Sequence, residues 1–358
     1  MKLGIIGLPG AGKTTIFNAL TRGDAPTGRS MGGRFDVLTA VVDVPDERVD
    51  RLSALFSPRK TTYAQVTYTD VAGLQKGVGE SGGLAGPLLN HLAGLDGFVH
   101  VVRAFEDKLL PHPDGSVESL RDLQALDTEL LLNDLVIVEG KLERLAEGLQ
   151  KGALKNRAEA QAEQALFQRL HTALSDEIPL RDLELEAAEE KALRGYGLLT
   201  LKPVLVVFNI GDDQDEVEVD YPHAHSAVVS LRGRLEAELA QLPPDEVALF
   251  MEEYGVSELG LNRVIRLSYD LLGLLSFYTV GEDEVRAWRG RRDATAVEAA
   301  AAIHSDLARG FIRAEVIGVE ELLALGGMAG ARAAGRLRLE GKQYRVQDGE
   351  IVHVKFNV

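Results

Sequence analysis

Gly7-Leu8-Pro9-Gly10-Ala11-Gly12-Lys13-Thr14 is the stretch of sequence that decides the fold. It fits the pattern G-x-x-x-x-G-K-[ST], between an expected strand at 3–6 and an expected helix at 15–20. The glycines let backbone N–H groups surround a phosphate chain at the positive end of the helix. Lys13 can reach the β- and γ-phosphate oxygens, and the Thr14 hydroxyl can ligate Mg²⁺. The segment predicts a phosphate loop whose nucleotide-binding residues are Pro9, Gly10, Ala11, Gly12, Lys13, Thr14 and Thr15.

Short apolar runs on either side of this loop predict the rest of the fold class. They are rich in β-branched residues, end at Gly or Asp, and alternate with helical patterns. Such alternation is typical of a largely parallel sheet covered by helices, so we expect an α/β fold. The expected strands are 3–6, 37–42, 66–69, 98–102, 203–208 and 227–229.

A second motif, Thr69-Asp70-Val71-Ala72-Gly73, matches D-x-x-G at the end of an expected strand. Asp70 is expected near the Mg²⁺, and the Gly73 N–H is placed to hydrogen-bond the γ-phosphate and to sense its loss. Ras-like enzymes place a water-orienting Gln directly after this motif, but here the residue is Leu74. We therefore expect a GTPase-type switch with slow intrinsic hydrolysis, in which Lys13 and Gly73 contribute to catalysis.

Base recognition is expected after the strand at 203–208. The segment Asn209-Ile210-Gly211-Asp212 resembles the N-K-x-D motif of GTPases, in which the Asp accepts hydrogen bonds from guanine, but Ile210 replaces the Lys. After the next strand, Ser230-Leu231-Arg232 lies where a loop supporting the base belongs. We expect Asn209, Ile210, Asp212, Ser230, Leu231 and Arg232 to contact the nucleotide.

The middle of the chain has a different periodicity. Apolar residues step by four and three, as in a heptad seam, and a second helical run follows Gly152, so an antiparallel helical hairpin is expected. A pair of ordinary surface helices is the alternative. The predicted domains are therefore 1–125 with 200–278, an inserted hairpin at 126–199, and a C-terminal domain at 279–358. Within that domain the segments 314–317, 337–339, 343–346 and 351–358 indicate a small mixed α/β unit. The two helical runs comprise Leu131, Leu135, Val138, Leu142, Leu145 and Leu149, then Ala158, Ala162, Leu166, Leu170 and Leu174.

The composition limits the possible partners and chemistry. The 358 residues carry a net charge of −16 and no cysteine, which excludes disulfides, thiolate metal sites and thiol catalysis. Residues 279–358 are balanced, with 12 basic and 12 acidic side chains, so the excess negative charge lies in 1–278. The acidic balance argues against a generic polyanion binder, and no DNA partner is expected. Without a signal peptide or a long apolar run, we expect no membrane association and a cytoplasmic location.

These features together resemble the YchF family, an Obg-related branch of P-loop GTPases. The most specific likeness lies in Glu284-Val285-Arg286-Ala287-Trp288, in Arg309 through Val316 and in Lys342 through Val358, with Val101 through Asp107 matching as well. The resemblance implies a P-loop G domain, an inserted α-helical coiled-coil hairpin and a C-terminal TGS-like β-grasp domain. It also implies hydrolysis of ATP, generally in preference to GTP, and association with the ribosome or ribosomal RNA.

His112 matches a family histidine proposed to assist hydrolysis from a flexible loop, and an imidazole there could orient or deprotonate the attacking water. A solvent-exposed loop histidine without a catalytic role is the alternative.

The departures from the family pattern keep two questions open. Asp212 replaces the usual Glu and suits guanine, while the missing Lys points away from an ordinary GTPase, so ATP is favoured and GTP remains the alternative. Arg34 stands where the first switch of the family carries a Thr. Together with Leu74, it supports a further alternative, a nucleotide-gated adaptor that hardly turns over its ligand. The leading prediction is a slow, Mg²⁺-dependent NTP hydrolase that acts as a molecular switch.

Overall fold

The computed structural model of this chain describes residues 1–23, 37–71, 86–151, 156–253, 256 and 258–357. They form two compact units. The first comprises Met1–Ala40 and Thr67–Val264, and the second comprises Val41–Val66 and Ile265–Val358. Each unit therefore draws on two separate stretches of the sequence.

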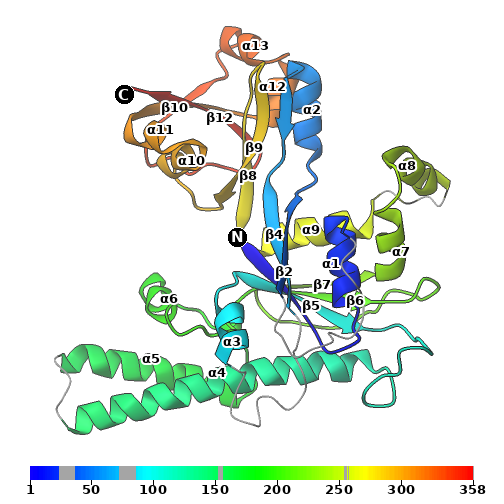
Figure 1. The fold of residues 1–358 in the computed structure, drawn as a ribbon. Coiled ribbons are helices and arrows are strands. Elements are labelled where there is room, and N and C mark those ends of the chain that lie inside the picture. The colour runs from blue at the N-terminus through cyan, green and yellow to red at the C-terminus, as the bar shows by residue number, and fades with distance from the viewer. Residues whose placement is uncertain (24–36, 72–85, 152–155, 254–255, 257, 358) are drawn as a thin grey trace. The chain divides into compact units, whose positions relative to one another are not determined.

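The first unit is built on a six-stranded sheet in the order β2-β4-β1-β5-β6-β7 (Figure 1). β1 pairs in parallel with β4 and β5, and β6 pairs in parallel with β5 and β7. Every residue of β5 and β6 is buried, as expected for central strands of a sheet covered on both faces. The predicted α/β class is thus confirmed. The strands are β1 (Lys2–Ile6), β2 (Val37–Asp43), β4 (Gln65–Val71), β5 (Gly97–Arg103), β6 (Val204–Asn209) and β7 (Ser226–Leu231).

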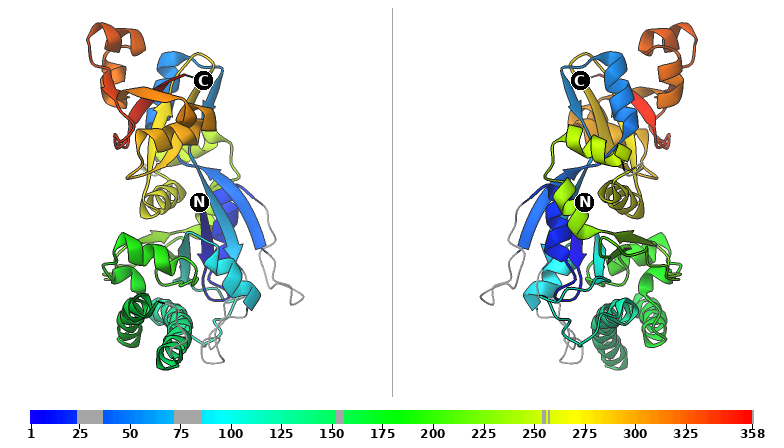
Figure 2. Two further views of the ribbon diagram at one scale, coloured as in Figure 1. Left: turned by 90° about the vertical axis from the view of Figure 1, so that its left-hand side faces the viewer. Right: turned by 90° about the vertical axis from the view of Figure 1, so that its right-hand side faces the viewer.

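The helices of the first unit include the long pair that was expected as a hairpin. α4 and α5 lie side by side in all three views of Figures 1 and 2. α4 begins well before the predicted position 126, because Leu123, Leu126 and Leu130 pack into the core beside the sheet. The helices are α1 (Lys13–Thr21), α3 (Gly86–Ala93), α4 (Ser119–Gln150), α5 (Arg157–Ser175), the 3₁₀ turn η1 (Leu180–Asp182), α6 (Ala187–Leu193), α7 (Gly233–Leu239), α8 (Pro244–Glu253) and α9 (Gly260–Leu271).

The two hairpin helices share a core of their own. Val138 from α4 packs with Leu166, Leu170 and Leu174 from α5, as the spacing predicts. Ala158 and Ala162 were expected in the seam but are exposed, whereas Ala160 and Phe167 are buried. The start of the α5 pattern was therefore assigned to the wrong helix face, because alanines carry little periodic information about burial.

Asp134 anchors α4 to the chain that returns from the hairpin. Its fully buried carboxylate accepts hydrogen bonds from the Leu199 N–H at 2.8 Å, the Thr200 N–H at 2.7 Å and the Thr200 hydroxyl at 2.7 Å. Burial raises the pKa of Asp134, and these donors act in the opposite direction by stabilising the charged form. The hairpin is thus tied to the sheet at its base by a buried polar contact.

The second unit has a mixed sheet in the order β11-β10-β12-β8-β9-β3. β12 pairs in parallel with β8, β8 and β9 are antiparallel, and β10 is antiparallel to both β11 and β12. Ala296, Ala299 and Ala300 of α10 belong to its core. The strands are β3 (Lys60–Thr62), β8 (Leu274–Thr279), β9 (Glu284–Arg291), β10 (Phe311–Gly318), β11 (Arg338–Glu340) and β12 (Glu350–Phe356), and the helices are α2 (Glu47–Phe56), α10 (Ala296–Ile303), α11 (Ser305–Arg309), α12 (Val319–Ala324) and α13 (Met328–Ala333).

Two sequence expectations differ from this unit. The segment 343–346, named among those of the expected α/β unit, contributes only an isolated bridge that joins Arg345 to Thr295. The predicted boundary at 278/279 falls inside β8, and 41–66 was assigned to the first domain. The structure groups 41–66 with the C-terminal strands because β3 pairs in parallel with β9 and the Tyr278 hydroxyl donates to Asp46.

No helix within the described ranges is both long enough and apolar enough to cross a membrane.

Candidate functional site

The predicted phosphate loop joins β1 to α1, at the edge of the sheet where the parallel strands end (Figure 1). Gly12 caps α1 with a φ of 91°, in the left-handed region that favours glycine. A Cβ on Gly12 would lie 2.2 Å from the Nδ2 of Asn209, so a side chain is excluded by packing as well. Within the loop Ala11 is buried and Pro9 is exposed, and Thr15 is half-buried in the first turn of α1. The loop is therefore shaped by both backbone conformation and close packing.

Lys13 and Thr14 are held in defined positions. The Lys13 ammonium donates to the carbonyl oxygens of Gly7 at 2.9 Å and Leu8 at 3.0 Å. The Thr14 hydroxyl donates to Oδ2 of Asp70 at 2.8 Å across a separation of 56 residues. The two motifs meet because β1 and β4 are parallel neighbours whose carboxyl ends share one edge of the sheet. The structure thus brings together the two side chains that were predicted as metal ligands.

Burial alters the ionisation of both charged groups in this cluster. It lowers the pKa of Lys13 to about 8, although the Asp70 carboxylate opposes the change. It raises the pKa of Asp70, with the Thr14 hydroxyl and the Lys13 ammonium opposing. Burial thus disfavours the charged form of each group in the free protein. A bound phosphate would stabilise the Lys13 ammonium, and a bound cation would stabilise the Asp70 carboxylate.

The donor set suits Mg²⁺. The ion prefers oxygen ligands, and the site offers the Thr14 hydroxyl and the Asp70 carboxylate. Oδ1 of Asp70 is buried and has no hydrogen-bond partner within the part of the chain that the structure describes. An orphaned buried carboxylate oxygen beside a phosphate loop is the feature expected where a metal, directly or through water, completes the site.

Asn209 joins the phosphate loop to the neighbouring strand end. Its Nδ2 donates to the Ala11 carbonyl at 3.0 Å, and its Oδ1 accepts from the Gly233 N–H at 3.1 Å. The side chain is 4% exposed, so both contacts are shielded from water. Asn209 was predicted as a base contact, but its amide is occupied here in fixing the loop.

The other predicted base contacts divide into two groups. The side chains of Ile210 and Leu231 are buried in the core, and the Ser230 hydroxyl accepts from the Val217 N–H at 2.9 Å. Arg232 instead lies at the surface and donates to the carbonyl of Asp212 at 2.9 Å. The Asp212 side chain is exposed, so its carboxylate is available to a base.

His112 is less open than a flexible-loop histidine would be. Its side chain is 4% exposed, and its Nε2 lies 2.8 Å from Oδ2 of Asp122 in the first turn of α4. Its Nδ1 accepts from the Asp114 N–H at 3.2 Å. The imidazole is therefore paired with its own loop and with the first turn of α4 in this structure.

The cluster of His112, Asp114 and Asp122 has the spacing of a metal site, since one ligand atom from each lies within 4.8 Å of the others. Arg121 supplies the cation there. Its Nη2 lies 3.0 Å from the Asp122 carboxylate, 3.5 Å from Nδ1 of His112 and 3.8 Å from the Asp114 carboxylate. The guanidinium balances these carboxylates, so the cluster is better explained as an ion-pair network than as a metal site.

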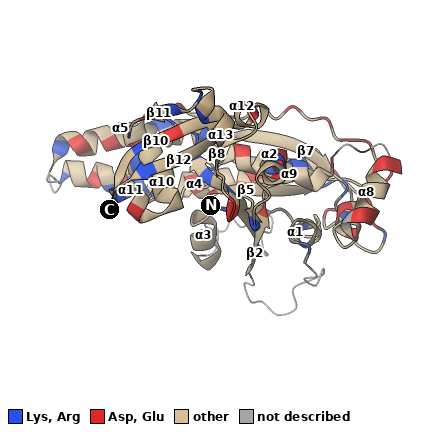
Figure 3. Cartoon of the chain, turned by 90° about the horizontal axis from the view of Figure 1, so that it is seen from above, with Lys and Arg blue, Asp and Glu red and all other residues tan. Residues whose placement is uncertain are grey.

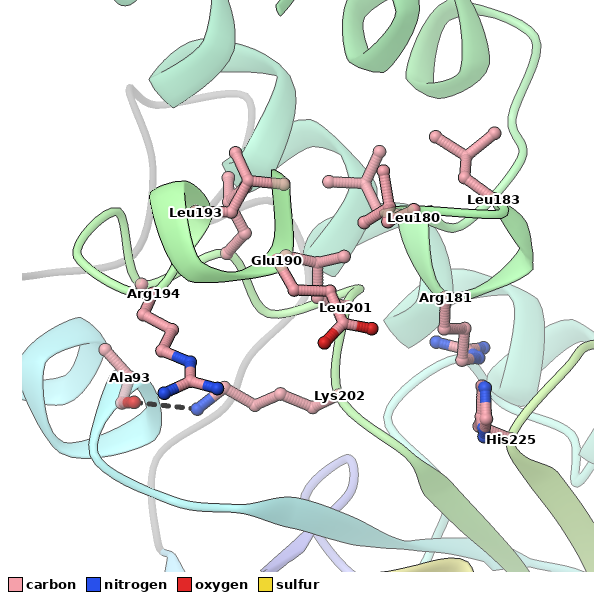
Figure 4. Close-up of a pocket in the computed structure, with 13 residues that line it drawn as sticks. Ala93, Leu180, Arg181, Leu183, Glu190, Leu193, Arg194, Leu201, Lys202 and His225 are labelled. Carbon is pink, nitrogen blue, oxygen red and sulfur yellow. Dashed lines mark hydrogen bonds between the residues drawn. The ribbon is translucent and has the colours of Figure 1, made fainter. Parts of the chain in front are cut away.

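A separate cavity of about 300 Å³ lies at the base of the hairpin (Figure 4). Lys202 on its wall donates to the carbonyls of Leu92 at 2.9 Å and Ala93 at 2.7 Å, and so caps the C-terminal end of α3. Arg181 and Arg194 also line it, together with several leucines. None of the predicted nucleotide-binding residues lines this cavity.

Three predicted functional positions, Arg34, Gly73 and Leu74, lie outside the described residues. In contrast, Arg103 and Phe105 adjoin the phosphate loop but were noted only as part of a family motif. A Cβ on Gly10 would lie 3.4 Å from the Arg103 guanidinium, and one on Gly12 would lie 3.8 Å from the Phe105 ring. The available signal in the sequence was a charged residue at the end of a mostly apolar strand.

A parallel sheet with a phosphate loop after its first strand, and an acidic side chain from the adjacent strand beside the loop threonine, defines a P-loop nucleotide-binding protein of the GTPase type. Comparison with known proteins agrees. A family model described as "50S ribosome-binding GTPase" matches residues 2–138, and the YchF-GTPase C-terminal model, described as "Protein of unknown function (DUF933)", matches residues 274–357. The chain belongs to the YchF family.

Relatives match over nearly the full length. The chain is 39% identical to the ribosome-binding ATPase YchF of Bacillus subtilis over 99% of both proteins, and 38% identical to that of Haemophilus influenzae over 100% of this chain and 99% of the relative. It is 36% identical to Obg-like ATPase 1 of Oryza sativa, covering 100% of this chain and 92% of that protein. The solved Schizosaccharomyces pombe YchF GTPase is similar in structure, with a TM-score of 0.84 at 28% identity, covering 99% of this chain and 97% of the other.

Proposed function

We propose that this chain is a slow, Mg²⁺-dependent P-loop nucleotide hydrolase that uses ATP and acts in the cytoplasm as a switch on the ribosome. The observation that carries the proposal is the cluster of Lys13, Thr14 and Asp70, with its hydrogen-bonded threonine and its unpartnered carboxylate oxygen. The relatives in Bacillus subtilis and Haemophilus influenzae are ribosome-binding ATPases, which supports both parts of the proposal.

The roles of the residues follow from their positions. Lys13 binds the β- and γ-phosphate oxygens, and backbone N–H groups of Gly10 through Thr14 surround the chain. Thr14 and Asp70 would hold Mg²⁺, which when bound neutralises charge on the phosphates. Gly73 would report the loss of the γ-phosphate through its N–H. These contacts make phosphate recognition electrostatic and largely independent of the base.

Contact with the base is proposed to depend on Asp212. A carboxylate accepts hydrogen bonds from the exocyclic amine of adenine or from N1 and N2 of guanine, so Asp212 alone does not separate the two. The hydrophobic Ile210 in place of the GTPase lysine favours ATP, as do the names of the relatives. Competition between ATP and GTP analogues for the same site tests this choice, and tighter binding of GTP would assign the chain to guanine nucleotides.

His112 is proposed to orient the attacking water after leaving its partner. Its pairing with Asp122 must be broken before the imidazole can serve a water at the γ-phosphate. This requirement, together with Leu74 in place of Gln, supports a low intrinsic rate. A ribosome that released His112 would then raise the rate.

The second unit is proposed to be a TGS-like β-grasp domain that contributes to ribosomal RNA binding. Its strand order and the two helices between β9 and β10, α10 and α11, support the first part of this assignment. Lys and Arg gather near β10 and β11 in Figure 3, whereas Asp and Glu mark α8. Arg336 and Arg338 are tied to Glu321 and Glu350, so Arg313 is the better candidate for a phosphate contact.

Phosphate release from ATP by the purified full-length chain with Mg²⁺, alone and with 70S ribosomes, tests the hydrolase proposal. The Lys13→Ala variant provides the background rate. We expect slow release by the wild type and at least about 100-fold less by the variant, since a preorganised charge contact is removed. If wild type and variant release phosphate equally, with and without ribosomes, the chain is a binding adaptor and not an enzyme.

Sedimentation through sucrose gradients tests the ribosome proposal. The chain should travel with ribosomal particles in at least one nucleotide state, ATP, ADP or none. Absence from the ribosomal fractions in all three states would refute this part and leave the hydrolase part standing.

A further inference from the structure

Arg103 is a charged residue in an unusual place. It ends β5 at the edge of the sheet that carries the phosphate loop, and it is 3% exposed. Within the described ranges no carboxylate forms an ion pair with it. A buried charge without a counterion is costly, and an arginine does not relieve that cost by losing its proton.

The guanidinium of Arg103 contacts the segment that follows β5 and also lies beside the phosphate loop. Nε donates to the Phe105 carbonyl at 3.1 Å and Nη2 donates to the Leu110 carbonyl at 2.7 Å, so both fix the segment that follows β5. The guanidinium carbon also lies 4.7 Å from the centroid of the Phe105 ring. Nη1 is buried and has no hydrogen-bond partner among the described residues. It lies 3.4 Å from where a Cβ on Gly10 would be, beside the phosphate loop.

The segment held by Arg103 leads directly to His112. The Leu110 side chain lies on the same side of Gly10 as the guanidinium, 3.6 Å from the position of a Cβ on that residue. The Ala104 N–H is bonded to the Asn209 carbonyl at 2.8 Å, so the start of the segment is also fixed at the strand edge. The buried guanidinium of Arg103 therefore lies beside both the phosphate loop and the segment 104–112.

We propose that Arg103 is a positioning residue whose buried charge is balanced by the polyphosphate of the bound nucleotide, and which thereby fixes the 104–112 segment when the loop is occupied. The inference rests on the proposed function. A purely structural arginine would hold Phe105 and Leu110 whether or not phosphate is present. An arginine balanced by phosphate would contribute to affinity in proportion to the charge of the ligand.

Nucleotide affinity as a function of ligand charge tests the proposal. The proteins are the full-length wild type, Arg103→Gln, Arg103→Lys and the control Arg234→Gln, which removes an exposed guanidinium paired with Glu238. The ligands are ATP, ADP and adenosine with Mg²⁺, measured by displacement of a labelled nucleotide. Arg103→Gln should weaken ATP binding by about tenfold, ADP binding by less and adenosine binding hardly at all. Arg103→Lys should recover most of the loss for ATP, and Arg234→Gln should match the wild type.

An equal loss for all three ligands would show a structural role only, and no loss for any of them would also overturn the inference. If Arg103→Gln does not fold, hydrogen exchange on the wild type decides the question. ATP should then slow amide exchange across 104–112 and adenosine should not, whereas equal exchange with both would refute the proposal. A wild-type chain that binds neither ATP nor GTP would refute the proposed function instead, so the two failures are distinguishable.

Discussion

Replacing Asn209 by Ala should weaken nucleotide binding, although the Asn209 side chain is not expected to touch the phosphates itself. The amide makes two shielded hydrogen bonds, to the Ala11 carbonyl and from the Gly233 N–H. Removing it leaves both backbone groups unsatisfied, at about 1–3 kcal/mol for each, so about 2–6 kcal/mol in all. Because Ala11 lies inside the phosphate loop, this cost falls on the conformation that binds phosphate. Even the lower value corresponds to about 30-fold weaker binding.

The assay is a titration with a fluorescent ATP analogue in Mg²⁺, with circular dichroism and thermal unfolding to confirm that the variant is folded. Asn357→Ala is the matched control, because that asparagine is exposed in the second unit. It should bind like the wild type. If folded Asn209→Ala binds within about twofold of the wild type, a value below the smallest cost derived above, the loop does not depend on this contact.

Three further perturbations follow from the same geometry. Gly12→Ala places a Cβ 2.2 Å from Nδ2 of Asn209 at a φ of 91°, so it should reduce ATP affinity at least as much as Asn209→Ala, measured by the same titration. Burial lowers the pKa of Lys13 to about 8, and phosphate needs the charged ammonium, so ATP affinity should be steady below that pH and fall above it; the fall should approach about tenfold per pH unit, and a flat profile to pH ~9.5 would contradict the shift. Asp134→Ala removes the acceptor for two buried N–H groups and for the Thr200 hydroxyl, so the free energy of opening at Thr200 should drop by about 2–6 kcal/mol in native-state hydrogen exchange, and unchanged protection there would show that the anchor is dispensable.

Much of the first unit could be predicted from the sequence, because its signals are local. The phosphate loop has a fixed spacing, and its flanking strand and helix agree with it. The meeting of Thr14 and Asp70 follows from one rule, that neighbouring parallel strands end at a common edge. Side-chain direction at a strand end is not local in this way. Asn209 matches a base-recognition motif, yet its contacts with Ala11 and Gly233 depend on how three separate loops converge.

The second unit shows a different limit. β3 has three residues, Lys60–Thr62, with little hydrophobic signal, and it joins a sheet whose other strands lie more than 200 residues further on. No periodicity in the sequence encodes such a parallel pairing across so long a separation. Arg103 was missed for a related reason. A charge at a strand end is normally solvated, and only its burial beside Gly10 indicates a role.

The most direct test of the central claim is the stoichiometry and location of nucleotide binding. Isothermal titration of Mg²⁺-ATP into the full-length wild type should show one site per chain, and Lys13→Ala should weaken that site by at least about tenfold, because a charge contact with the phosphates is lost. Binding by Lys13→Ala with wild-type affinity, or no binding of ATP or GTP by the wild type, would contradict the assignment of the 7–14 loop as the nucleotide site.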